Sequence, residues 1–148
     1  MRIANGVLLA MLALLLSGAA AAPKQWEVRM ANSAGNGTLM VFDPGYLAIR
    51  PGDSVKFVAA DKGHNAESIA GMAPAGAAPF RGRINEEIVV TFAVPGLYAV
   101  KCLPHFGMGM VALIQVGAAT NKAQIAAAAN ALPAAAKARI SALLAQVR

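Results

Sequence analysis

The sequence predicts an all-β fold, a β-sandwich followed by two short helices, and three observations support this. Between residues 25 and 117, short apolar or alternating runs recur roughly every ten residues. Turn signals rich in Pro, Gly and Asp separate these runs, as in 43–45 and 50–53. After residue 117 the chain becomes rich in alanine, which favours helix. About six to eight strands at this spacing are typical of a sandwich.

The expected strands follow one another with short connections. The first run, Trp26–Met30, alternates apolar and polar residues, as a strand with one buried face does. The others are Leu39–Phe42, Tyr46–Ile49, Val55–Ala59, Ile88–Ala93, Leu97–Lys101 and Val111–Val116. Their apolar positions would supply one inner face from each of two sheets.

The last 31 residues, 118–148, form a separate helical extension to the sandwich of residues 22–117. Pro133 divides the extension into two expected helices, Asn121–Leu132 and Ala134–Val147. In the second helix, apolar residues recur at helical spacing, at Ile140, Leu143, Leu144 and Val147. We therefore expect an amphipathic helix packed on the sandwich.

Residues 1–21 have the pattern of a cleaved secretory signal peptide. Arg2 gives the positive start, and the apolar run Gly6–Leu16 is too short for a comfortable membrane span. Small residues follow, with a cleavage signal at Ala19-Ala20-Ala21. The alternative is a retained anchor helix. We expect export to the periplasm and no membrane span in the mature protein.

The charge balance favours acidic partners. The chain has 13 Lys and Arg against 7 Asp and Glu, a net charge of +6. These cations are scattered, and no basic run or basic helix face is present. We therefore expect no nucleic-acid partner.

The chemistry-bearing residues gather in two loops between strands. Cys102 is the only cysteine, so no intramolecular disulfide can form, and His105, Met108 and Met110 follow it closely. The only other histidine is His64. A thiolate and thioether favour Cu(I) while imidazoles suit both copper states, so this set indicates a mononuclear blue (type 1) copper site. Spacing alone does not decide between Met108 and Met110 as the axial ligand.

Other interpretations of these residues have less support. Each residue alone has an ordinary explanation, as surface His or buried Cys. Zinc would usually take a further Cys or His, and the chain offers none. A cysteine nucleophile with His105 as its base would need an oxyanion hole and usually a third orienting group, for which the sequence gives no sign.

Several motifs resemble those of the pseudoazurins, a family of cupredoxins. They are Pro51-Gly52-Asp53, Asp61-Lys62-Gly63-His64-Asn65, Ile84-Asn85-Glu86 and the loop from Lys101 to Met110. The resemblance covers essentially the whole chain after the signal segment, including the helical tail. It implies a cupredoxin-type Greek-key β-sandwich with one copper ion near one end, held by His64, Cys102, His105 and Met110. Met108 would then lie near the metal without binding it.

The resemblance also gives Asn65 a role in bracing the two ligand loops, with its backbone N–H directed at the cysteine sulfur. Leu103 stands where the family often has threonine. The Asn65 side chain therefore lacks the hydroxyl partner that threonine would offer.

The resemblance further implies that an electron leaves through His105 and a surrounding apolar patch, for which Met40, Pro104 and Met108 are candidates. Cations would surround that patch at Lys62, Arg81 and Lys101, and such a surface gives fast, weak, salt-sensitive docking to an acidic partner. Ser33 stands where the family often has lysine.

The resemblance implies a function as well as a site. It implies a monomeric periplasmic electron carrier, without enzyme activity, that delivers single electrons to reductases of denitrification. The expected partners are copper or haem nitrite reductase, nitrous oxide reductase or c-type cytochromes. The alternative is a periplasmic protein for copper storage or delivery, which would use the same soft ligands.

Overall fold

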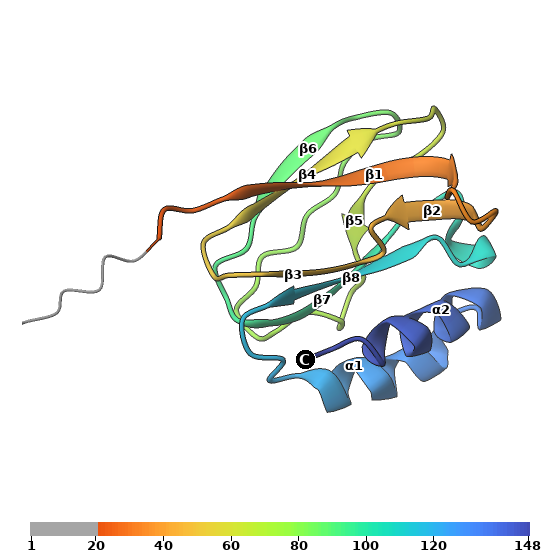
Figure 1. Ribbon diagram of the computed structural model, residues 1–148. Helices are drawn as coiled ribbons and strands as arrows, with labels where there is room; N and C mark the ends of the chain where they lie inside the picture. Colours follow the sequence, from red (N-terminus) through yellow and green to blue (C-terminus); the bar gives the residue numbers. More distant parts are fainter. Residues whose placement is uncertain (1–20) are drawn as a thin grey trace, which may run out of the picture.

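The computed structural model describes residues 21–148 and contains two facing sheets with a pair of helices beneath them (Figure 1). The signal segment expected at 1–21 lies almost entirely outside the described residues. One sheet has the strand order β2-β1-β4-β6, and the other has the order β3-β8-β7-β5. The expected β-sandwich is confirmed.

The strand bounds follow the sequence pattern closely. The strands are β1 (Gln25–Ser33), β2 (Leu39–Asp43), β3 (Tyr46–Ile49), β4 (Ser54–Ala59), β5 (Glu67–Ser68), β6 (Ile88–Thr91), β7 (Gly96–Lys101) and β8 (Val111–Val116). β5 was not predicted, because a strand of two residues has no periodicity to detect. The run expected to end at Ala93 ends as a strand at Thr91.

Both sheets mix parallel and antiparallel pairs. β1 is parallel to β4 and antiparallel to β2, while β8 is parallel to β3 and antiparallel to β7. As a result β1, β4 and β7 all end at the same pole of the sandwich (Figure 1). The loop after β4 contains His64, and the loop after β7 contains Cys102 and His105. The topology therefore brings together two segments 38 residues apart in sequence.

The core lies between the sheets and is rich in aromatic rings. Phe57 is fully buried and lies edge-on to Phe42, and its ring stacks on Phe80 at 5.9 Å between centroids. Cys102 and Met110 belong to the same buried cluster. The cysteine thus closes one end of the core rather than standing in an open loop.

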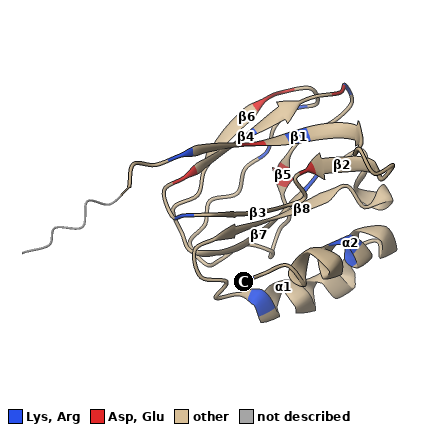
Figure 2. Cartoon of the chain, viewed as in Figure 1, with Lys and Arg blue, Asp and Glu red and all other residues tan. Residues whose placement is uncertain are grey.

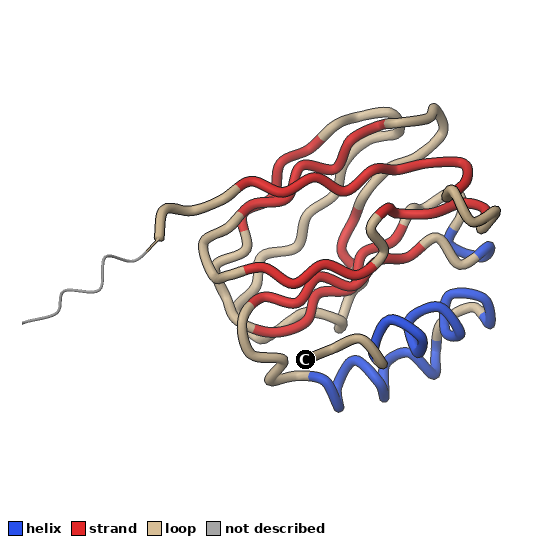
Figure 3. Tube along the Cα trace, viewed as in Figure 1, coloured by secondary structure: helices blue, strands red, loops and turns tan. Residues whose placement is uncertain are grey.

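The helical tail covers the outer face of the second sheet (Figure 3). It consists of α1 (Lys122–Ala128), a 3-10 turn η2 (Ala129–Ala131) and α2 (Ala134–Leu144). Ile140, Leu143 and Leu144 are buried in a second cluster with side chains of β7 and β8. β7 and β8 are therefore covered on both faces, which explains their continuous apolar sequence.

The expected first helix, 121–132, is divided into α1 and η2 in the structure. In Figure 2 the ribbon of α1 and α2 has positions coloured as Lys or Arg and none coloured as Asp or Glu. Within residues 21–148, no helix has both the length and the apolar character needed to cross a bilayer.

Candidate metal centre

Three soft or borderline metal-binding atoms converge at the pole where β4 and β7 end. His64 Nδ1 lies 3.1 Å from His105 Nδ1, and Cys102 Sγ lies 3.7 Å and 3.5 Å from these two nitrogens. His64 and Cys102 are fully buried, and His105 is partly exposed. Both imidazoles therefore present the same ring nitrogen to a common centre, a detail that the sequence could not give.

The spacing of these atoms fits a first-row transition metal. A point about 2.0 Å from all three atoms lies inside the triangle they form, close to typical metal–nitrogen and metal–sulfur bond lengths of about 2.0–2.3 Å. The donor set of two imidazoles and one thiolate is that of a trigonal copper site. The arrangement therefore fits copper in both distance and chemistry.

The ligand loop between β7 and β8 is closed by its own backbone. The Cys102 N–H donates to the Met110 carbonyl at 3.0 Å, and the Met108 and Met110 N–H groups both donate to the His105 carbonyl. A 3-10 turn, η1 (Phe106–Met108), fills the loop and ends at Gly109, which has a left-handed backbone with φ of 85°. These bonds fix His105 relative to Cys102.

The same turn separates the two methionines. Met110 is fully buried in the cluster that contains Cys102, whereas Met108 is 52% exposed. An extended segment would point both side chains the same way, but η1 and Gly109 turn them apart. The ambiguity in the sequence came from treating the loop as extended.

Asn32, at the end of β1, holds the other nitrogen of His64, and sequence analysis missed it. Its Oδ1 lies 2.9 Å from His64 Nε2. Because a side-chain carbonyl oxygen can only accept, Nε2 carries the proton and Nδ1 presents its lone pair to the centre. A partner that fixes the tautomer in this way is typical of metal-binding histidines. Parallel pairing of β1 with β4 brings Asn32 here, and no local motif could have indicated it.

Asn65 connects the two ligand loops through its side chain. Its Oδ1 accepts a hydrogen bond from the Leu103 N–H at 2.7 Å, so the backbone of Leu103 provides a donor although its side chain has no hydroxyl. Its Nδ2 donates to Glu67 Oε2 and to the Gly82 carbonyl, both at 3.1 Å. The main-chain N–H of Leu103 therefore takes the place of the hydroxyl that a threonine would offer to the Asn65 side chain.

Burial controls the protonation of the donors. It raises the pKa of the Cys102 thiol, which hydrogen bonds from the backbone N–H groups of Asn65 and His105 partly oppose. Burial also lowers the pKa of His64, with a further contribution from the nearby His105. The imidazole of His64 is therefore held in the neutral form, which can bind a metal.

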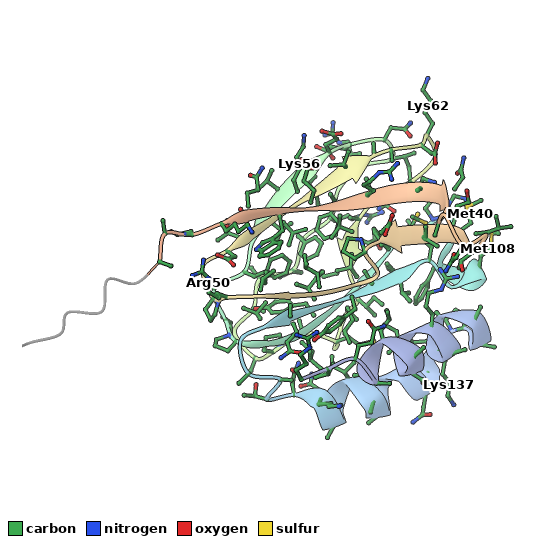
Figure 4. The ribbon with its side chains drawn as sticks, in the orientation of Figure 1. Met40, Arg50, Lys56, Lys62, Met108 and Lys137 are labelled. Carbon is green, nitrogen blue, oxygen red and sulfur yellow. The ribbon has the colours of Figure 1, made fainter. Side chains whose placement is uncertain are left out.

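Glu67 on β5 pairs with two of the cations expected around the site. Its carboxylate lies 3.2 Å from Arg81 Nε and 3.3 Å from Lys101 Nζ. Lys101 Nζ also lies 5.0 Å from the centre of the Phe106 ring. Lys62 and Pro104 are exposed, and Met40 is partly buried. Figure 4 shows Lys62 pointing away from the protein.

Two facing sheets with a His₂Cys triangle and a buried thioether at one pole define a cupredoxin, a small copper-binding electron carrier. A family model described as copper binding proteins of the plastocyanin/azurin family matches residues 28–117. A pseudoazurin of Paracoccus pantotrophus is 46% identical over 138 residues, covering 93% of this chain and 92% of that protein.

Solved structures agree with these sequence matches. The crystal structure of native pseudoazurin from Hyphomicrobium denitrificans gives a TM-score of 0.78 at 42% identity and covers 84% of this chain and 98% of that chain. Pseudoazurin from Methylobacterium extorquens AM1 gives 0.78 at 41% identity, covering 84% and 99% of the two chains. The chain belongs to the pseudoazurin family. Its cofactor is copper, and it is an electron carrier rather than an enzyme.

Proposed function

We propose that this chain is a periplasmic electron carrier that binds one type 1 copper ion through His64, Cys102, His105 and Met110. The observation that carries the proposal is the triangle of His64 Nδ1, His105 Nδ1 and Cys102 Sγ, with sides of 3.1–3.7 Å. Met110 rather than Met108 would supply the fourth ligand, because its side chain is buried in the cluster that contains Cys102, whereas Met108 is exposed.

The protein supplies a rigid set of metal ligands and one route by which electrons reach the surface. Bound copper supplies a one-electron couple, and the loop hydrogen bonds keep the donors in place so that little rearrangement accompanies a change of charge. His64 is fully buried, so electrons leave by the partly exposed ring of His105. Around it Met40, Pro104 and Met108 form the apolar docking patch.

Cations next to this patch guide an acidic partner. Arg81 and Lys101 share one carboxylate, that of Glu67, so the three groups together carry a net charge of +1. Lys62 adds an exposed cation. This weakly positive surface supports brief, salt-sensitive docking of a monomeric carrier.

The partners we propose are periplasmic reductases of denitrification, namely copper or haem nitrite reductase and nitrous oxide reductase, with c-type cytochromes as further candidates. Residues 1–21 would export the chain as a cleaved signal peptide. Cleavage would remove Arg2 and leave 12 basic and 7 acidic residues, a net charge of +5, which is consistent with acidic partners of this kind.

Stopped-flow electron transfer from the reduced protein to a purified nitrite reductase tests this function. At low salt the rate constant should fall in Lys62→Ala and stay unchanged in Lys122→Ala, which removes an exposed cation from α1. The variants should converge at high salt, where charges are screened. Absence of transfer to any of these reductases, together with rapid release of copper to a chelator, would instead favour copper storage or delivery.

A further inference from the structure

The helix α2 reaches the metal pole and touches the ligand loop directly. Its first turn contains Ala135, whose carbonyl oxygen would lie only 2.9 Å from a Cβ placed on Gly109. Gly109 directly precedes Met110. The tail helix therefore packs against the backbone of the loop at the residue next to the proposed axial ligand.

One turn further along α2, Arg139 connects the helix to the start of β2. Its Nη1 donates to the Met40 carbonyl at 2.6 Å, and its Nη2 donates to the Leu39 carbonyl at 3.3 Å. The side chain is partly buried and lines a groove between β2 and α2. Among the described residues no carboxylate forms an ion pair with Arg139. Partial burial of a guanidinium without a paired carboxylate carries a desolvation cost, which these two hydrogen bonds offset in part.

The carbonyl that Arg139 binds belongs to a strained residue. Met40 has a φ of 49°, a left-handed conformation that methionine seldom adopts. Such a conformation persists only where neighbouring groups hold it. The two hydrogen bonds of Arg139 hold the carbonyls of Met40 and of the preceding residue, Leu39. Met40 packs against the core cluster that contains Cys102 and Met110.

We infer that Arg139 is a positioning residue for the metal centre, which acts from the tail helix by holding Met40 against the cluster that contains Cys102 and Met110, while Ala135 supports Gly109. This inference rests on the ligand set proposed above. Loss of these hydrogen bonds would let Met40 leave its strained conformation and admit water to the end of the core that contains Cys102 and Met110. Because the oxidised site carries one more positive charge, water would stabilise it, lowering the reduction potential and slowing electron self-exchange.

The test compares Arg139→Met and Arg139→Lys with the control Lys137→Met, at an exposed position of the same helix (Figure 4). Both Arg139 variants should show a lowered reduction potential and a changed ratio of the visible absorption bands, with the smaller shift in Arg139→Lys. In the copper-free proteins, amide hydrogen exchange at residues 39–41 should quicken in Arg139→Met. The control should match the wild type in all three measurements.

Two results would overturn the inference. One is an unchanged potential and spectrum in both Arg139 variants, with only thermal stability reduced, as a purely structural role requires. The other is a shift in Arg139→Met with wild-type potential in Arg139→Lys and unchanged exchange in both variants, because the charge alone would then be responsible. If the wild type itself fails to turn blue with Cu(II), the proposed ligand set is wrong. That result is obtained from the wild type alone, so it is distinguished from failure of the inference about Arg139.

Discussion

Removal of the Asn65 side chain should destabilise the copper-free protein by roughly 2–4 kcal/mol. Asn65 is 2% exposed and makes three side-chain hydrogen bonds, to the Leu103 N–H, the Gly82 carbonyl and Glu67. In Asn65→Ala the first two groups lose this partner, at about 1–3 kcal/mol for each buried group left unsatisfied. Leu103 is exposed, so water can relieve part of that cost. Glu67 retains its two cations.

Urea unfolding of the copper-free protein measures this loss without a contribution from metal binding. The matched control is Asn36→Ala, because Asn36 is exposed and accepts one hydrogen bond, from the Thr38 N–H at 3.0 Å. That variant should lie within about 0.5 kcal/mol of the wild type. A loss below about 1 kcal/mol in Asn65→Ala would refute the reasoning, since the bridge between the ligand loops would then contribute little.

Three further predictions concern the histidine support, the axial ligand and acid stability. Asn32→Leu should weaken copper binding about 10–100-fold in competition titrations, because His64 Nε2 loses its hydrogen-bond acceptor. A copper affinity equal to that of the control variant Asn36→Leu would contradict this prediction. Met110→Leu should change the visible spectrum and reduction potential far more than Met108→Leu, and the reverse order would make Met108 the axial ligand. Asp53 has a pKa lowered from 3.8 to about 2, chiefly by the hydrogen bond from a backbone N–H. Its contribution to stability is therefore complete above pH 4 and lost as the pH falls toward 2. When the free energy of unfolding is measured as a function of pH, Asp53→Asn should lose less stability in this pH window than the wild type does. A pH profile identical to that of the wild type would contradict the assignment.

Much of the fold was predictable because apolar periodicity and turn residues are local signals. The run Val111–Val116 coincides with β8, and the turn at residues 50–53 separates β3 from β4. The apolar face of α2 at Ile140 and Leu143 is buried as expected. β5 escaped prediction because its pairing with β7 depends on residues distant in sequence.

The ligands of the metal centre were predictable from the sequence, but the residues that hold those ligands in place were not. Scarcity identified His64, Cys102 and His105, because the chain has no other histidine or cysteine. The contacts of Asn32 with His64 and of Glu67 with the surrounding cations depend on strand register, which a single sequence does not reveal. The pairing with Glu67 makes the cationic surface weaker than the sequence suggested.

The most direct measurement is a titration of the purified copper-free protein with Cu(II), followed by visible absorption. Thiolate-to-copper charge transfer should produce an intense blue band that reaches its maximum at one equivalent of copper per chain. Cys102→Ser should abolish that band. A colourless wild-type protein, a different stoichiometry or a blue Cys102→Ser variant would each contradict the proposed type 1 copper site.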